Sequence, residues 1–214
     1  MRAMILAAGL GSRMRPLTNH TPKPLLEIGG KPLIVWHIER LKEAGFTQIV
    51  INVAYLGQQI INYLGDGSQY GVKLYFSDEQ NEGALETAGG ILKALPLLSD
   101  TFLVVNGDVW TDYTFDKNFM LSQDNLAHLV LIDNPEHNLD GDFLLDGTDN
   151  KYTFSGIGYY SKEMFKDLDY GKQGLAPLLF KAVDDERLST EYHTGVWYDI
   201  GTPARLKSLN TLIK

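Results

Sequence analysis

The chain of 214 residues contains no cysteine. Disulfide bonds, thiolate nucleophiles and cysteine-ligated zinc are therefore excluded as parts of its structure or chemistry. A chain without cysteine is compatible with the reducing cytosol, and we expect a cytoplasmic protein. At this length a chain can bury most of its surface in one large domain, so no cross-links are needed to stabilise it.

Long apolar runs are also missing, because no segment approaches the ~18 consecutive apolar residues of a membrane-spanning helix. The N-terminal stretch MRAMILAAGLGSRMR ends in glycines and arginines, so it predicts a buried first strand and not a signal peptide. The net charge of −8 argues against a broad nucleic-acid-binding surface. We therefore expect neither a membrane nor a nucleic acid as a partner.

Positive charge is scarce in the chain but concentrated near its start. Residues 1–31 hold five basic side chains against one acid, Glu27, which is a local excess of four positive charges. Such a region suits an anionic small-molecule substrate. The alternative is chance clustering on a solvated face.

Apolar periodicity predicts alternating strands and helices followed by mixed strands. Strands are predicted at 4–8, 48–53, 72–76, 102–105, 127–132, 143–145, 152–160 and 196–200, and helices at 32–43, 56–64, 85–95, 175–183 and 203–212, the last with Thr202 as N-cap. This order predicts a single α/β domain over 1–214, with a doubly wound parallel half (1–112) and a half with mixed strands (113–214). Ligands of such sheets bind at the carboxyl ends of the strands.

The first predicted strand runs into a glycine-rich turn with the sequence AAGLGSRMRPL at 7–17. Glycines let backbone N–H groups approach phosphate oxygens, and Arg13 can add a bidentate contact. A plain tight turn is the alternative, and a dinucleotide site is a third reading. The dinucleotide fingerprint requires a third glycine where Met14 stands and an acid where Asn52 stands, so NAD and FAD are disfavoured.

Three further motifs place single charged residues in stiff or buried surroundings. Lys23 lies between two prolines, which fixes its backbone in a way that suits a phosphate ligand; a surface lysine in an extended loop is the alternative. Asp108 follows a buried strand, where a carboxylate can hold Mg²⁺ or simply form a turn. Asp199 lies in a short apolar strand, where a metal, a salt bridge or a cap must compensate its charge.

These motifs occur in one order with LETAGG at 85–90 and DIGTP at 199–203, and this ordered set resembles the sugar nucleotidyltransferase family. The resemblance extends over nearly the whole chain. It implies a Rossmann-like, glycosyltransferase-A-like fold, with a mixed, mainly parallel sheet flanked by helices. It also implies a nucleotide-binding half at 1–112 and a sugar-binding half at 113–214, with UTP and a sugar 1-phosphate as substrates and Mg²⁺ as cofactor.

The resemblance also implies roles for individual residues. Arg13, Lys23 and Asp108 are the expected catalytic residues, and Asp108 and Asp199 are the expected metal ligands. Nucleotide contacts are expected from Ala8, Gly9, Gly11, Ser12, Arg13, Lys23, Glu86 and Thr87, and sugar contacts from Asn106, Asp142 and Gly156.

Within the family, VNGDVWTDY at 105–113, GDF at 141–143 and TFSGI at 153–157 look like the compact uridylyltransferases that use N-acetylmuramic acid α-1-phosphate. These form UDP-N-acetylmuramic acid and pyrophosphate in cell-wall recycling. The alternatives are a glucose-1-phosphate thymidylyl- or uridylyltransferase, a mannose-1-phosphate guanylyltransferase, and a non-catalytic nucleotide-sugar sensor. Many relatives continue into a C-terminal β-helix, and since this chain stops after its DIGTP helix we expect a monomer.

One departure from the family concerns the sugar phosphate. Many members carry Glu-Lys-Pro before the sugar-binding strand, with the lysine on that phosphate, whereas residues 143–151 here read FLLDGTDNK. Lys151 is the substitute that the sequence offers, in a turn position.

Overall fold

The computed structural model describes residues 1–213. Its main strands are β1 (Arg2–Leu6), β4 (Gln48–Val53), β5 (Lys73–Asp78), β6 (Thr101–Asn106), β8 (Ala127–Ile132), β9 (Phe143–Leu144), β10 (Lys151–Ser161) and β11 (Leu188–Tyr192). Its helices are α1 (Leu33–Glu43), α2 (Gly57–Leu64), α3 (Glu86–Ala94), α4 (Ala176–Asp184) and α5 (Pro203–Leu212). Two small sheets pair β2 (Glu27–Ile28) with β3 (Lys31–Pro32) and β7 (Val109–Thr111) with β12 (Trp197–Asp199).

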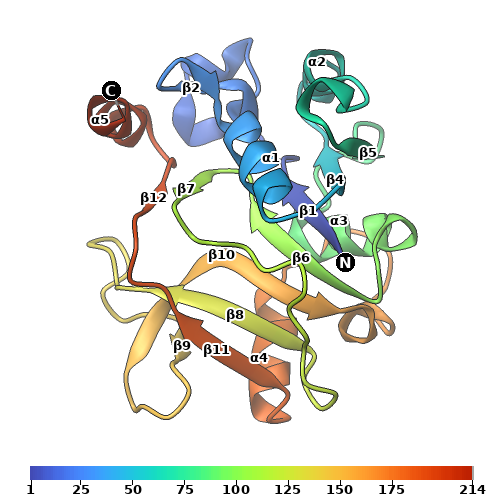
Figure 1. The fold of residues 1–214 in the computed structure, drawn as a ribbon, viewed down its shortest axis with the longest axis vertical. Helices are drawn as coiled ribbons and strands as arrows, with labels where there is room; N and C mark the ends of the chain where they lie inside the picture. Colours follow the sequence, from blue (N-terminus) through green and yellow to red (C-terminus); the bar gives the residue numbers. More distant parts are fainter. Residues whose placement is uncertain (214) are drawn as a thin grey trace.

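The main sheet has the order β11-β8-β10-β6-β1-β4-β5, with β9 added beside β10 (Figure 1). Strands β5, β4, β1 and β6 are parallel, whereas β10 runs antiparallel to both β6 and β8. The expected mixed, mainly parallel sheet is therefore confirmed. From β1 the chain goes outward through β4 and β5 and then returns to the other side of β1 with β6, which makes a topological switch point between β1 and β6.

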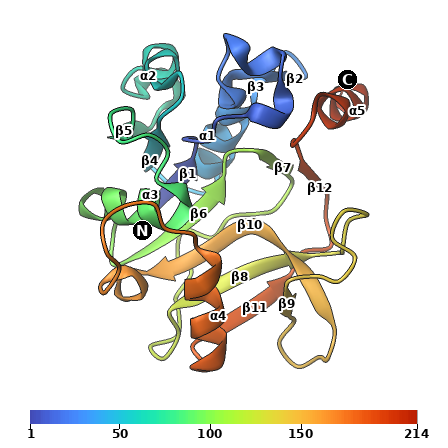
Figure 2. The same cartoon turned by 180° about the vertical axis from the view of Figure 1, so that it is seen from behind.

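Side chains of the central strands alternate between two layers of core. Ala3 and Ile5 pack with α1 and α2, whereas Met4 packs with α3 and α4 on the other face. Figures 1 and 2 show these helix pairs on opposite sides of the sheet. Because both faces are covered, the strands read as nearly continuous apolar runs, which is why the sequence revealed them.

The predicted strands at 48–53 and 127–132 and the helix at 203–212 have the observed bounds, and most other predicted elements differ by one or two residues. Thr202 caps α5, its side chain accepting a hydrogen bond from the Arg205 amide at 3.3 Å. The strand β11 was missed. Its sequence, LSTEY, is mostly polar and half-buried at the sheet edge, so it lacks the apolar signal of the central strands.

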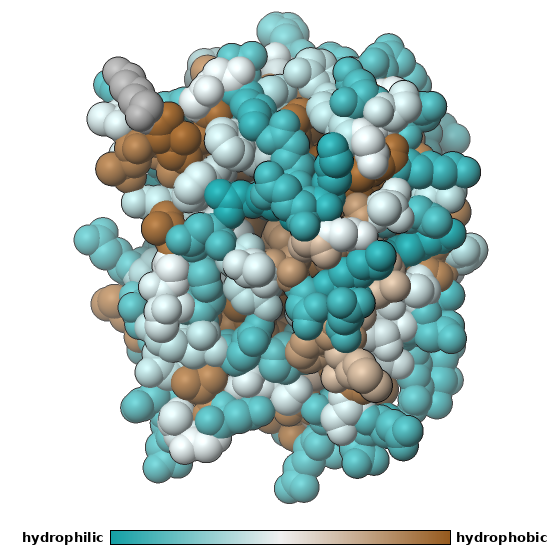
Figure 3. Space-filling model, in the orientation of Figure 1, coloured by the Kyte–Doolittle hydropathy of each residue, from teal (hydrophilic) through white to brown (hydrophobic). Residues whose placement is uncertain are grey.

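The face shown in Figure 3 is mostly polar, with apolar side chains in separate small areas. Among residues 1–213, no helix has the combination of length and apolar character that crossing a bilayer requires.

His37 on α1 is a buried titratable group inside this core. Burial lowers the pKa of His37 to about 4, against the opposing effect of a hydrogen bond to the backbone of Val109. Its Nε2 atom has no hydrogen-bond partner among the described residues. The unfolded chain therefore binds a proton near pH 6.5 that the folded chain does not bind until about pH 4.

We expect the free energy of unfolding to fall as the pH drops from 6.5 towards 4, with His37 contributing up to about 1.4 kcal/mol per pH unit. A His37→Phe variant removes this contribution and should show a shallower pH dependence. Urea unfolding at several pH values measures it, with exposed His20→Gln as the control. Equal slopes for wild type and His37→Phe would contradict the assignment.

Candidate active site

The carboxyl ends of three neighbouring strands are in register at the switch point. Leu6 of β1 is in register with Asn52 of β4 on one side and with Asn106 of β6 on the other. The segments that follow these strands therefore border one cavity of about 410 Å³. Its lining comprises Leu6, Ala7, Ala8, Gly9, Leu10, Gly11, Ser12, Arg13, Met14, Lys23, Pro24, Asn52, Ala84, Glu86, Thr87, Asn106, Gly107, Asp108 and Gly201.

The glycine-rich turn after β1 forms one wall of this cavity. Gly11 has φ +60°, a left-handed conformation that glycine adopts without strain, and its carbonyl accepts a hydrogen bond from Thr18 Oγ1 at 2.7 Å. A Cβ on Gly11 would lie 3.0 Å from Thr18 Cγ2, so a larger residue would be crowded as well as strained. The turn then continues into a short 3₁₀ segment, Ser12–Met14, which presents Arg13 to the cavity.

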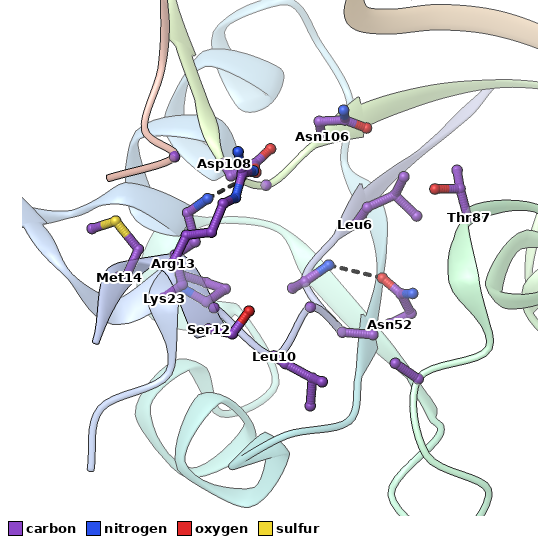
Figure 4. A pocket seen from close by; sticks show the side chains of 18 of the residues that line it. Leu6, Leu10, Ser12, Arg13, Met14, Lys23, Asn52, Thr87, Asn106 and Asp108 are labelled. Carbon is purple, nitrogen blue, oxygen red and sulfur yellow. Dashed lines mark hydrogen bonds and ion pairs between the residues drawn. The ribbon is translucent and has the colours of Figure 1, made fainter. Parts of the chain in front are cut away.

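The charged side of the cavity is built around Asp108. Lys23 Nζ lies 2.8 Å from Asp108 Oδ2, and the lysine side chain is only 11% exposed. Figure 4 shows Arg13 and Lys23 both extending towards Asp108, with Asn52 and Thr87 across the cavity. This arrangement brings together the three residues that the sequence singled out as catalytic.

Gly107 fixes the place where Asp108 leaves the sheet. Its N–H donates to the Leu6 carbonyl at 2.9 Å, and a Cβ at this position would lie 2.3 Å from that same oxygen. Only glycine lets β6 and β1 approach so closely, so the Asn-Gly-Asp sequence here is required by packing as well as by the turn.

Opposite Asp108, a buried chain of hydrogen bonds joins three segments. Ala7 N–H donates to Asn52 Oδ1 at 2.8 Å, Asn52 Nδ2 donates to Glu79 Oε1 at 2.8 Å, and Leu85 N–H donates to Glu79 Oε2 at 2.9 Å. Glu79 is fully buried, and burial raises its pKa even though both hydrogen bonds act in the other direction. The network ties the glycine-rich turn to the loop that carries Glu86.

Glu79 was not predicted from the sequence, and Asn52 served there only as evidence against a dinucleotide site. A polar residue at the end of an otherwise apolar strand, as Asn52 is in QIVINV, was the signal that could have revealed the network. Glu86, directly after Leu85, has φ +61°, an unusual conformation for a residue other than glycine.

A second cavity of about 410 Å³ adjoins the first and shares Arg13, Asn106 and Asp108 with it. Its other lining residues are Val109, His137, Asn138, Thr153, Phe154, Ser155, Gly156, Trp197 and Asp199. Gly156 has φ +80°, and a Cβ there would lie 2.5 Å from Asn106 Nδ2, so this glycine makes room for the Asn106 side chain.

Two residues expected near the sugar lie outside these linings. Asp142 accepts hydrogen bonds from Asn138 Nδ2 at 3.0 Å and from the Phe154 amide at 2.9 Å, so it supports two residues that do line the second cavity. Lys151 is absent from the residues that line either cavity. The other expected site residues, Ala8, Gly9, Gly11, Ser12, Arg13, Lys23, Glu86, Thr87, Asn106, Asp108, Gly156 and Asp199, line one cavity or both.

Asp199 reaches the second cavity from β12, which pairs with β7 directly after Asp108. Asp199 is in register with Val109, and the Ile200 amide donates to the Asp108 carbonyl at 2.9 Å. Its carboxylate forms an ion pair with Arg205 of α5 and lies 3.8 Å from His137 Nε2. This partly buried acid therefore has one of the partners that the sequence left open, a salt bridge, and the partner is an arginine.

The two aspartates suit a magnesium ion in type and number. Both line the second cavity, whereas the residues 1–213 contain no group of three or more acids and histidines arranged for a metal. Mg²⁺ is commonly held by one or two carboxylates together with phosphate oxygens and water, so two aspartates beside a glycine-rich turn are a donor set that fits it.

A glycine-rich turn at the switch point of a doubly wound sheet, with a cation–carboxylate pair beside it, is the arrangement typical of nucleotide-binding sites in such folds. The nucleotidyl transferase family model matches residues 2–143, more than half of the chain, and the chain belongs to this family.

Relatives with curated names include three kinds of sugar-phosphate nucleotidyltransferase. The N-acetylmuramate alpha-1-phosphate uridylyltransferase of Neisseria meningitidis is 54% identical, over 99% of this chain and 98% of that one. The UTP–glucose-1-phosphate uridylyltransferase of Synechocystis is 43% identical, over 62% of this chain and 37% of its own length. The mannose-1-phosphate guanylyltransferase catalytic subunit beta of Drosophila pseudoobscura is 30% identical, over 94% and 59%.

Solved structures share the fold. A putative glucose-1-phosphate thymidylyltransferase from Bacillus anthracis superposes with a TM-score of 0.83 at 23% identity, covering 100% of this chain and 95% of that one. HddC from Yersinia pseudotuberculosis gives a TM-score of 0.80 at 22% identity, covering 100% and 99%. These likenesses confirm the Rossmann-like architecture that the motif order implied.

Glu79→Gln is expected to destabilise the protein, because an amide offers only one acceptor oxygen where two N–H donors point at the carboxylate. One donor would then face the NH₂ group, at a cost of about 1–3 kcal/mol in the free energy of unfolding. Urea unfolding measures this cost. Exposed Glu43→Gln is the matched control and should change stability by less than about 0.5 kcal/mol; similar values for the two variants would contradict the network's role.

Proposed function

We propose that this protein is a uridylyltransferase that converts UTP and N-acetylmuramic acid α-1-phosphate into UDP-N-acetylmuramic acid and pyrophosphate. The observation that carries the proposal is the 54% identity to the Neisseria enzyme along essentially the full length of both chains. The site agrees with it, since an anion-binding cavity joins a second cavity through three shared residues. One cavity suits a nucleoside triphosphate and the other a sugar phosphate.

The proposed reaction is an in-line displacement. An oxygen of the sugar phosphate attacks the α-phosphorus of UTP, the new P–O bond forms, and the bond to the β-phosphate breaks to release pyrophosphate. The nucleophile is already an anion, so no serine, cysteine or histidine needs to be activated. Catalysis then consists mainly of positioning two anions and compensating their charge.

The residues of the two cavities divide this work. Backbone N–H groups of Gly11 and Ser12 would bind the triphosphate, and Arg13, which lines both cavities, would hold the departing pyrophosphate. Lys23 would contact the α-phosphate region, since its ammonium lies 2.8 Å from Asp108, a proposed metal ligand, and the residue lines the first cavity. Glu86 and Thr87 would lie beside the uridine.

Asp108 and Asp199 would hold Mg²⁺, which supplies charge neutralisation at the reacting phosphates when it is bound. Among residues 1–213, Asp108 and Asp199 are the carboxylates that line the second cavity, so the remaining ligands would come from the substrate phosphates and from water.

Pyrophosphate release tests the substrate assignment. We expect turnover with Mg²⁺ when UTP is paired with N-acetylmuramic acid α-1-phosphate, in a matrix with dTTP, GTP and CTP and with the 1-phosphates of N-acetylglucosamine, glucose and mannose. Turnover confined to another pair would retain the reaction class and reject the muramic acid substrate. A folded protein inactive throughout the matrix would instead support a nucleotide-sugar sensor.

Asp108→Ala is expected to lower kcat by on the order of 10³-fold, because it removes a proposed metal ligand and the partner of Lys23. The variant should remain folded, since the side chain is 37% exposed. Steady-state kinetics and circular dichroism measure both properties, with exposed Asp149→Ala as the control. Wild-type turnover in Asp108→Ala would remove Asp108 from the catalytic residues.

A further inference from the structure

We infer that Arg205, assisted by His137, binds an anionic group of the sugar substrate. The inference rests on the proposed function and deepens it, because nothing in the sequence motifs accounts for how the sugar phosphate is held. The group is an oxyanion, either the phosphate monoester or the carboxylate that distinguishes muramic acid from N-acetylglucosamine.

The guanidinium of Arg205 lies beside the second cavity, although Arg205 is not itself among the residues that line either cavity. Its Nη1 donates to Asp199 Oδ2, and its Nη2 lies 3.0 Å from His137 Nδ1. Both of these partners line the second cavity. Gly201 lines the first cavity, and a Cβ on it would lie 3.3 Å from Arg205 Nη1. The guanidinium therefore contacts two residues of the second cavity and lies close to Gly201 of the first.

Few cationic side chains among residues 1–213 line the two cavities. Among residues 1–213, the lysines and arginines that line them are Arg13 and Lys23 alone. Arg13 lies beside the glycine-rich turn, and Lys23 is paired with Asp108, so both are placed for the triphosphate. A sugar 1-phosphate brings a second anion into a site whose two cationic side chains are already assigned to the triphosphate.

Arg205 has the donors for this role. A guanidinium carries five N–H groups in a planar fork, and the contacts to Asp199 and His137 use only two of its nitrogens. The side chain is 35% exposed, so solvent reaches it in the substrate-free protein. A fork of this kind matches two oxygens of a phosphate or a carboxylate at once.

His137 completes the subsite. Because Arg205 has no acceptor, His137 Nδ1 must accept the hydrogen bond from Nη2, which leaves the proton of the neutral ring on Nε2. The ring lines the second cavity and is about half exposed, so this N–H can donate to a bound oxyanion.

Kinetics of Arg205→Ala test the inference, with KM measured separately for the sugar 1-phosphate and for UTP. We expect KM for the sugar substrate to rise about tenfold to 100-fold, the effect of losing a charged hydrogen-bonded contact, while KM for UTP stays within about twofold. Arg205→Lys should recover part of the loss, since it keeps the charge without the fork. Lys207→Ala removes an exposed charge from the same helix and should leave both KM values unchanged.

A comparison of two sugar substrates shows which anionic group Arg205 binds. Equal losses with the 1-phosphates of N-acetylmuramic acid and N-acetylglucosamine would assign Arg205 to the phosphate. A loss confined to the muramic acid compound would assign it to the carboxylate. If KM for both sugars is unchanged and only kcat or the Mg²⁺ concentration for half-maximal activity shifts, Arg205 merely positions Asp199 and the inference is overturned.

Calorimetric titration of N-acetylmuramic acid α-1-phosphate into the folded proteins tests the same point without turnover. Weaker binding to Arg205→Ala than to the wild type and Lys207→Ala is expected, and equal binding would overturn the inference. A wild-type protein that is active only with another sugar 1-phosphate would reject the proposed muramic acid substrate, and the Arg205 test would then be made with that sugar. A wild-type protein that binds none of the sugar phosphates would reject both.

Discussion

The parallel pairing of β1 with β4 and β6 is the constraint on which the rest of the site depends. It brings Leu6, Asn52 and Asn106 to one level, so that the turn after β1, the end of β4 and the Gly107–Asp108 turn border the same space. The turn after β1 contributes backbone N–H groups, the end of β4 contributes the buried amide of Asn52, and the Gly107–Asp108 turn contributes a carboxylate. The tight contact of Gly107 with the Leu6 carbonyl shows how little freedom the arrangement has.

Charge compensation in the substrate-free protein follows from this geometry. Lys23 neutralises Asp108, and Arg205 neutralises Asp199, so neither aspartate stands as an uncompensated charge. An isolated carboxylate in such partly buried surroundings would be costly. In the proposed mechanism, anionic phosphates would take over the cations that the aspartates hold, and the Mg²⁺ proposed to bind the aspartates would replace those cations. The aspartates would then not be left without compensating charge.

Much of this could be predicted from the sequence, for physical reasons that differ between elements. The central strands are covered on both faces and read as apolar runs, and the glycines and charged residues of the motifs follow those strands directly. The edge strand β11 carries no such pattern. The Asn52–Glu79–Leu85 network could not be predicted either, because it joins residues 45 and 27 positions apart through contacts that only the folded sheet creates.

The β7–β12 pair explains why the last motif of the chain belongs to the same site as the first. Hydrogen bonds between these short strands place Asp199 beside Val109, and the Ile200 amide binds the Asp108 carbonyl. The chain then turns through Gly201 into α5, whose N-cap, Thr202, accepts from the Arg205 amide and so fixes the start of the helix. Because Arg205 lies in the first turn of α5, this cap also fixes the position of its backbone close to Asp199. The Asp-Ile-Gly-Thr-Pro motif therefore determines the position of an arginine that lies outside it. The Glu-Lys-Pro lysine of the family is missing here, and under the inference above a cation from this C-terminal helix would bind an anionic group of the sugar substrate instead.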